Sequence, residues 1–156
     1  MADMEPRSKN LRTPDDTVQL PGIIEDLVDL GDLTVGRTVQ QPGWRWSTHS
    51  RPIVGGDWCQ AHHVGVVLSG RFGAELKDGT VLDLEPDDVY DIPPDHDGYT
   101  IGDEPCVLLE WSGLSAFLGE IVLILKAQFW IPVRWSWGHH VSLVSLGTSA
   151  TTRRNL

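Results

Sequence analysis

The sequence is poor in basic residues. Its 156 residues include 12 lysines and arginines against 22 aspartates and glutamates, which gives a formal net charge of -10 at pH 7. Proteins bind nucleic acids mainly through basic groups that neutralise phosphates, so we expect no nucleic-acid partner. The excess of negative charge ends near residue 110. Only one acidic residue but four basic residues lie beyond it, so residues 1–110 carry 21 acidic against 8 basic groups.

Cysteine is also scarce, with only Cys59 and Cys106 in the whole chain. The first residues, MADMEPRSKN, lack the apolar run of a signal peptide. We therefore expect a cytoplasmic protein in which both thiols are reduced. Cys106, within PCVLLEW, is typical of a small buried apolar residue. Cys59 lies close to two histidines, and for it a metal-ligand role is an equal alternative.

Long helical patterns and common catalytic motifs are missing too. The sequence has no nucleophile elbow, no phosphate-binding loop and no paired CxxC motif, so nothing supports a hydrolase or a nucleotide-binding protein. From Ile23 onward, short apolar runs are interrupted by Gly, Pro and Asp at intervals of about eight to twelve residues. This punctuation predicts an all-β protein with antiparallel strands, and closure into a barrel would remove exposed strand edges.

Composition divides the chain into three parts. Residues 1–22 form a polar arm with Pro6 and Pro14, and residues 1–20 show no apolar period, so we expect a disordered arm with little structure. Residues 23–113 are the expected barrel domain. Residues 114–156 are an atypical apolar and basic extension.

The extension begins with an unusually apolar stretch. Residues 114–133 are numerous enough to span a bilayer, but they include Glu120, Lys126 and Gln128, which are costly at a membrane centre. A membrane helix is therefore disfavoured. We expect instead that this stretch lies on the barrel or contacts a second copy of the chain.

The clearest strand pair is the hairpin RFGAELKDGTVLDLEP. Phe72 and Ala74 alternate with polar residues, Asp78-Gly79 supplies the backbone angles of a tight turn, and Leu82 resumes the alternation. The runs VYDIPP, YTIG and CVLLEW predict further strands. The run IIEDLVDL is ambiguous, because its apolar positions fit a short helix as well as a strand.

The stretch DWCQAHHVGVVLSGRF contains the first candidate metal ligands. Residues four apart in a strand lie about 13 Å from each other, so Cys59 and His63 can share one ion only if the chain bends at residues 60–62. Adjacent residues of an extended chain point in opposite directions. We therefore predict that Cys59 and His63 face inward and that His62 faces outward.

The stretch IPPDHDGY contains a second candidate. His96 is flanked by Asp95 and Asp97, and it is either a metal ligand oriented by these carboxylates or a surface histidine with a mildly raised pKa. His49, in WRWSTHSRP, is a further available imidazole.

Residues 33–112 as a whole resemble a small single-domain cupin of the type-2 conserved-barrel class. The first motif of that family is G-x5-H-x-H-x3,4-E-x6-G. With its last glycine on Gly70, His63 stands at the glutamate position, Cys59 at the second histidine and Asp57 at the first.

The second motif of the family is G-x5-P-x-G-x2-H-x3-N. Pro93 matches its proline, while Asp87 and Asp95 stand in place of its two glycines. The histidine position falls on Gly98, and His96 comes two residues earlier.

The resemblance implies a double-stranded antiparallel β-barrel of the jelly-roll type, often dimeric, with a central pocket that often holds a divalent metal. The pattern is similar to a cupin subgroup with a Cys, His and His set, sometimes attached to nucleotide-cyclase domains. It implies ligands Cys59, His63 and His96, with His49 or Asp57 as the fourth. Thiolate and imidazole favour zinc, with iron and manganese as alternatives. A pocket without metal, holding an organic ligand or nothing, is the other alternative.

Three functions are consistent with this pattern. The first is a binding or regulatory module with a metal or small ligand in the barrel. The second is a metal-dependent enzyme, an oxygenase, isomerase or lyase acting on a small organic acid or phenol. The third is an assembly module that uses the C-terminal extension. The absence of a catalytic signature favours the first, but a fold alone does not decide whether the chain is an enzyme. We further expect a homodimer.

Overall fold

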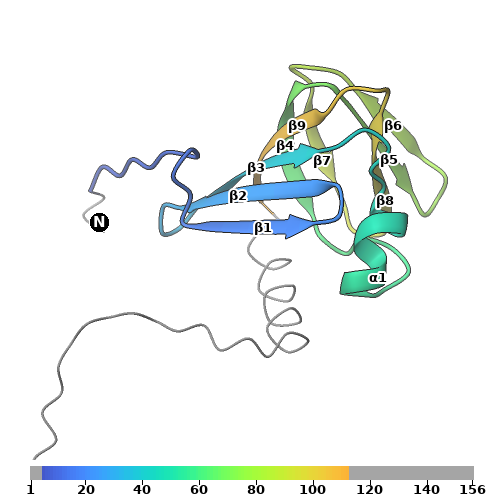
Figure 1. Ribbon diagram of the computed structural model, residues 1–156, viewed down its shortest axis with the longest axis horizontal. Helices are drawn as coiled ribbons and strands as arrows, with labels where there is room; N and C mark the ends of the chain where they lie inside the picture. The colour runs from blue at the N-terminus through green and yellow to red at the C-terminus, as the bar shows by residue number, and fades with distance from the viewer. Residues whose placement is uncertain (1–4, 113–156) are drawn as a thin grey trace, which may run out of the picture.

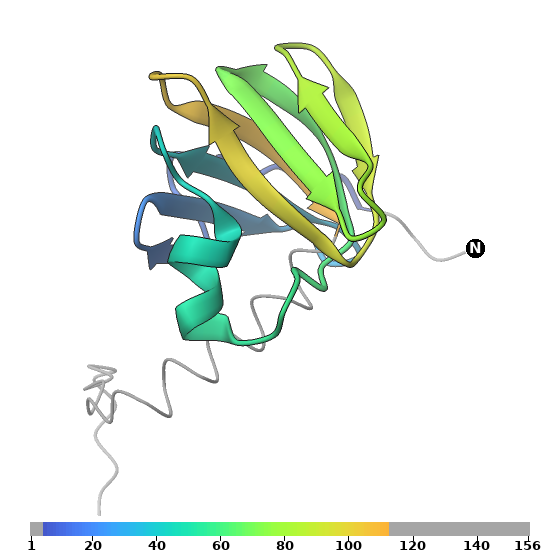
Figure 2. The same ribbon diagram turned by 90° about the vertical axis from the view of Figure 1, so that its right-hand side faces the viewer.

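Two antiparallel β-sheets face each other and enclose the core (Figures 1 and 2). They are described by a computed structural model that covers residues 5–112. The expected extension, residues 114–156, lies outside the described residues, and so do its predicted membrane and assembly roles. Within residues 5–112, no helix is long and apolar enough to cross a membrane.

The larger sheet has six strands in the order β1-β2-β3-β9-β4-β7. Their bounds are β1 Asp16–Leu20, β2 Ile23–Asp29, β3 Thr34–Gln40, β9 Cys106–Ser112, β4 His63–Ser69 and β7 Val89–Ile92. Strand β9 comes last in the described chain but pairs between β3 and β4. This crossover brings residues from distant parts of the sequence onto one inner face.

The smaller sheet has three strands in the order β6-β5-β8. Their bounds are β5 Arg71–Leu76, β6 Val81–Leu84 and β8 His96–Ile101. Strands β5 and β6 form the predicted hairpin, with Phe72 opposite Leu84 and Ala74 opposite Leu82. Phe72 and Ala74 are buried, as the alternation predicts.

Two short helical segments connect β3 to β4. One turn of π-helix, η1 (Trp46–Ser50), runs directly into α1 (Arg51–Val54), which has Pro52 in its first turn. Both lie at one end of the sheets (Figure 2). Ile53 and Val54 pack against buried residues of β1 and β2, so the connection covers that end of the core.

The N-terminal region differs from the expectation. Residues 16–20 form strand β1, although we predicted little structure over residues 1–20, so that prediction is wrong for this segment. Val18 and Leu20 alternate with polar residues and are buried. Pairing with β2 supplies the partner that a five-residue strand needs. The ambiguous run IIEDLVDL is the strand β2 rather than a helix.

Between the sheets lies the hydrophobic core. Val67, Ile92, Cys106 and Leu108 are almost fully buried in it. Burying one such aliphatic side chain stabilises the fold by about 1.5–3 kcal/mol. The expectation that Cys106 is a buried apolar residue is confirmed, and both described cysteines are free thiols.

Candidate metal centre

The chain bends between Cys59 and His63. Strand β4 begins only at His63, and Cys59 Sγ lies 3.7 Å from His63 Nε2, far closer than an extended chain allows. Cys59 is buried, His63 is partly buried, and His62 is exposed with its Nε2 2.6 Å from Asp91 Oδ1. The predicted bend and the predicted facing of all three residues are confirmed.

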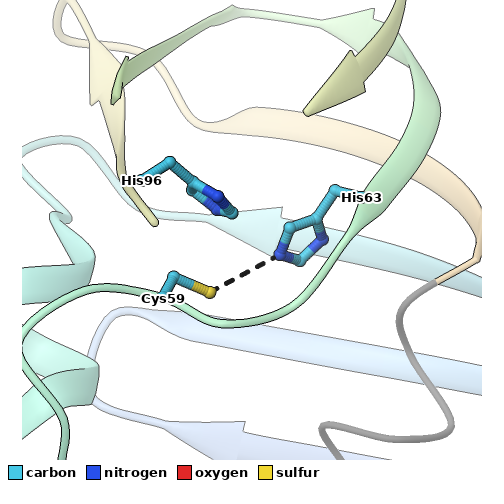
Figure 3. A group of neighbouring side chains, drawn as sticks. All are labelled: Cys59, His63 and His96. Atoms are coloured by element: carbon cyan, nitrogen blue, oxygen red, sulfur yellow. Dashed lines mark hydrogen bonds between the residues drawn. The ribbon is translucent and has the colours of Figure 1, made fainter. Parts of the chain in front are cut away.

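His96 joins this pair from the other sheet. Backbone pairing places it beside Cys59, because Cys59 N donates to His96 O at 2.9 Å and Asp95 N donates to Cys59 O at 2.9 Å. The ring of His96 lies edge-on to that of His63, with 5.1 Å between centroids. Figure 3 shows the three side chains converging from the loop before β4, from the start of β4 and from the start of β8. One potential ligand atom from each residue lies within 4.8 Å of the others.

Each histidine has its Nδ1 atom next to an oxygen atom outside the cluster. His96 Nδ1 lies 2.7 Å from the carbonyl oxygen of Pro93, and His63 Nδ1 lies 3.0 Å from Glu110 Oε1. Glu110 also accepts a 2.8 Å hydrogen bond from the hydroxyl of Tyr90. Such outer partners fix the orientation of a metal-binding imidazole. They leave Nε2 of both rings available to the cluster.

The aspartates that flank His96 do not orient it. Asp97 accepts hydrogen bonds from Arg45 Nε at 2.6 Å and from Ser47 N at 2.9 Å, and Asp95 accepts one from Gln60 at 2.8 Å. In a strand, neighbouring side chains point to opposite faces, so a flanking carboxylate cannot reach the same site. His96 is itself buried, which makes the surface interpretation of this histidine wrong as well.

The two proposed fourth ligands do not join the cluster. His49 lies in η1, where its Nδ1 is 3.1 Å from Arg45 N and 2.8 Å from Thr48 Oγ1. Asp57 is exposed in the loop after α1. Among the described residues, the group therefore consists of one sulfur and two nitrogen ligands.

The electrostatics of the cluster favour a thiolate. Burial alone would raise the pKa of the Cys59 thiol, but hydrogen bonds and charge from His63 and His96 outweigh it and lower the pKa to about 6. For His63, burial opposes protonation, yet Glu110 and Cys59 raise its pKa well above the ordinary value. Without a metal, both shifts favour a charged pair, with a thiolate on Cys59 and an imidazolium on His63. A metal ion would take the place of the shared proton.

This donor set fits zinc. A tetrahedral zinc ion with thiolate and imidazole ligands holds its donor atoms roughly 3.3–3.8 Å apart, given Zn–S and Zn–N bonds of about 2.3 and 2.0–2.1 Å. The Cys59 Sγ to His63 Nε2 distance of 3.7 Å lies in that range. The donors of all three residues lie within 4.8 Å of one another and would draw closer around a bound ion.

The backbone at Asp87 and Asp95 has the conformation that glycine favours, as expected if these residues replace the two motif glycines. Asp87 and Asp95, which replace the two motif glycines, have φ angles of 75° and 68°. They are the only residues other than glycine with positive φ among those described. Aspartate tolerates this conformation better than most residues, so the loop geometry can persist without glycine.

A cavity adjoins the cluster. The centres of water-sized molecules can occupy about 60 Å³ of it. Its lining residues include Cys59, His63 and His96, the aromatic residues Trp44, Trp46 and Phe72, and the buried polar residues Glu25, Thr38, Gln40, Ser50 and Glu110. Gly98, where the family motif has its histidine, also lines it, on the same face of β8 as His96.

Sequence reasoning missed the two buried glutamates. Glu25 lies in β2 and Glu110 in β9, and both alternate with buried apolar residues of their strands. That alternation is the sequence signal that could have predicted the burial of both glutamates. In CVLLEW, the period that buries Cys106 and Leu108 also turns Glu110 inward.

No family model and no curated protein matches the chain. Among solved structures, ectoine synthase from P. lautus is 12% identical, with 69% of this chain and 78% of that chain covered and a TM-score of 0.51. A cupin-like protein from Thermotoga maritima is 19% identical, with coverages of 75% and 84% and a TM-score of 0.46. KdgF from Halomonas sp. is 23% identical, with coverages of 63% and 86% and a TM-score of 0.45. At such identities the likeness concerns the fold. The likeness to ectoine synthase agrees with the two facing antiparallel sheets and with the barrel that the sequence resemblance implies, so the described part of this chain has the cupin fold.

Proposed function

We propose that the barrel binds one divalent metal ion, zinc in preference to iron or manganese, through Cys59 Sγ and the Nε2 atoms of His63 and His96. The observation that carries the proposal is the convergence of these three donors within 4.8 Å, with both Nδ1 atoms next to oxygen partners outside the cluster. Buried thiolate and imidazole groups are the ligands that zinc accepts most readily.

The proposed role is a binding or regulatory module. Three protein ligands leave a coordination position for a small ligand, and the cavity beside the cluster offers space for one. When bound, the metal would supply a Lewis acid at that position. The chain's own residues would orient the ligands, through Glu110 and Pro93, and exclude bulk water from the cluster.

Elemental analysis of protein purified without a metal-binding tag tests the metal site. We expect about one metal ion per chain, and its loss in Cys59→Ser and His96→Ala. His62→Ala and Cys106→Ala are matched controls, because they change an exposed histidine and a buried cysteine outside the cluster. Cobalt(II) loading should give a thiolate-to-metal absorption band that Cys59→Ser abolishes. Absence of metal after reconstitution under reducing conditions would overturn the proposal.

A metal-dependent enzyme is the second candidate. It is favoured by the contact between the cavity and the three candidate ligands, because a substrate in that cavity would lie beside the metal. The substrate class would be a small organic acid or phenol. Turnover of such compounds by the metal-loaded protein, lost in Cys59→Ser but kept in Cys106→Ala, would favour the enzyme over the binding module.

We also propose that the chain forms a homodimer in a reducing compartment such as the cytoplasm. The outer face of the larger sheet supports this, because Val66, Val89 and Leu109 are paired across β7, β4 and β9, and Val89 is 70% exposed. Trp111 is also exposed on this face. Sedimentation velocity should show a dimer that Val89→Lys shifts toward monomer. A role for residues 114–156 in assembly stays a prediction.

A further inference from the structure

The cavity lining contains, outside the cluster, a carboxyl group with few partners. Glu25 on β2 is 7% exposed and lines the cavity. Its side-chain hydrogen bond within residues 5–112 comes from Thr38 Oγ1 and is long, at 3.4 Å. A buried carboxyl normally has close donors, because burial without them is unfavourable. Burial and then repulsion by Glu110 raise the pKa of Glu25 to about 8.

The positive charge that acts on Glu25 comes from His63, whose Nδ1 lies 3.0 Å from Glu110. Glu110 also accepts a hydrogen bond from Tyr90. None of the described lining residues is a lysine or arginine. The two positive charges of a divalent ion at the cluster would balance the negative charges of the Cys59 thiolate and the Glu110 carboxylate. When Glu25 is ionised, its negative charge then has no counterpart. The cavity is therefore suited to a cationic rather than an anionic ligand.

The remaining walls are aromatic. Trp44, Trp46 and Phe72 line the cavity and are each at least nine-tenths buried. Aromatic faces attract ammonium groups, and the attraction is stronger when the partners are removed from water. The indole nitrogens of Trp44 and Trp46 have no hydrogen-bond partner within the described residues. A ligand with an oxygen acceptor is therefore the competing possibility.

The size of the cavity limits the ligand. One water molecule fills about 10–15 Å³, and the centres of water-sized molecules can move over about 60 Å³ of this cavity, so it holds several waters. This is enough for a short-chain organic molecule and too little for a nucleotide.

We propose that this cavity binds a small aliphatic amine as its ammonium ion, with the nitrogen on Glu25 and the hydrocarbon chain against Trp44, Trp46 and Phe72. The proposal rests on the proposed function only in that a bound metal would balance the other negative charges. On binding, Glu25 would release its proton to solvent, and the ammonium group would donate to the resulting carboxylate and neutralise its charge. Hydrogen bonds to charged groups contribute about 1.5–3 kcal/mol, which corresponds to a preference of about tenfold or more.

Three probes of similar size and different charge test the proposal, namely n-butylammonium, 1-butanol and propionate. Their binding is followed by chemical-shift titration of the ¹⁵N-labelled full chain, using the indole resonances of Trp44 and Trp46. We expect butylammonium to bind at least about tenfold more tightly than the other two. Equal or tighter binding of propionate or butanol would overturn the proposal, and so would the absence of binding by all three.

Variants then test whether the Glu25 carboxylate is the group that holds the ammonium ion. Glu25→Gln keeps the shape of the side chain and should reduce butylammonium binding about tenfold or more without affecting butanol. Glu104→Gln is the matched control, because it removes an exposed carboxylate on the loop between β8 and β9. Unchanged butylammonium binding by Glu25→Gln would contradict the assignment. The comparison of probes on the unaltered chain remains decisive even if Glu25→Gln folds poorly.

Each titration is run on chelator-treated protein and on zinc-loaded protein. If butylammonium binding depends on Glu25 in both the chelator-treated and the zinc-loaded protein, the amine does not bind by coordinating the metal. If the protein takes up no metal, the metal proposal fails while the amine proposal is still tested by the chelator-treated form. Amine binding that occurs only with zinc and does not depend on Glu25 would overturn the amine proposal alone.

Discussion

The cavity lining has two polar regions with different surroundings: the metal-ligand cluster with its outer partners (the cluster side) and Glu25 on β2 (the Glu25 side). On the cluster side, Nδ1 of His63 and Nδ1 of His96 each lie next to an oxygen partner, and three donor atoms converge. On the Glu25 side, the carboxyl has one long hydrogen bond from Thr38. The first arrangement is organised in advance for a compact ion. The second leaves a buried group whose partner must come from a ligand or a proton.

The largest expected effect is the loss of stability when metal is removed from the cluster side. A ligand that binds only the folded chain stabilises it by about 4 kcal/mol at a concentration about 1,000 times its Kd. We expect excess chelator to lower the unfolding temperature of the zinc-loaded chain strongly. Cys59→Ala should unfold at the same temperature with and without chelator, as measured by circular dichroism. An equal chelator effect on both proteins would place the metal elsewhere.

The next effect concerns the Glu25 side and depends on pH. The folded-state pKa of Glu25 is about 8, above its ordinary value of 4.5, so the folded chain holds a proton that the unfolded chain releases. Stability is therefore highest below about pH 4.5, as far as this group is concerned, and declines as the pH rises toward 8. In metal-free protein, Glu25→Gln should remove this decline.

Urea denaturation of both proteins at several pH values measures the difference. One pKa unit corresponds to about 1.4 kcal/mol, and the pKa of Glu25 is raised from 4.5 to about 8. We therefore expect the stability of Glu25→Gln relative to the unaltered chain to rise by up to about 4 kcal/mol from pH 4.5 to pH 8. Glu104→Gln should show no such trend. A relative stability that does not change with pH would mean that Glu25 is ionised in the folded state with a partner of its own.

A smaller effect tests how the cluster side is organised. Glu110→Gln keeps the size of the side chain but removes the charge beside His63 Nδ1. Loss of such an outer partner typically reduces metal affinity about 10- to 100-fold. Tyr90→Phe removes only the hydroxyl that donates to Glu110 and should weaken zinc binding less. Competition with a chromophoric chelator gives both affinities, and an equal loss in the two variants would count against a direct role for Glu110.

The two sides also differ in how far their structure could be predicted from the sequence. The turn at Asp78-Gly79 predicts the β5–β6 hairpin, and the distance between Cys59 and His63 requires the bend that the structure has. These inferences use local spacing, which the chain sets by itself. The burial of Glu25 depends instead on β1 and β2 closing over the cavity, and β1 is too short and polar to predict alone.

The residues that orient the candidate ligands could not be predicted, because they are brought there by pairing between distant segments. Glu110 meets His63 because β9 pairs with β4, and Pro93 rather than a flanking aspartate orients His96 because of the direction of β8. Neither contact follows from spacing within a motif. The candidate ligands could therefore be predicted from the sequence, while the residues that orient them could not.

The smallest expected effect concerns the backbone that supports the cluster side. Asp95 precedes His96, has a φ of 68°, and donates its backbone N–H to Cys59 O. Alanine is disfavoured in this conformation by about 1 kcal/mol, whereas asparagine adopts it readily and keeps a side-chain acceptor for Gln60. Asp95→Ala should therefore lower the free energy of unfolding by about 1 kcal/mol and Asp95→Asn should leave it nearly unchanged, as measured by urea denaturation. Because the same backbone holds Cys59 beside His96, Asp95→Ala should also weaken zinc binding slightly. A loss of stability in Asp95→Asn equal to that in Asp95→Ala would show that the charge of Asp95, rather than its backbone conformation, supports the site.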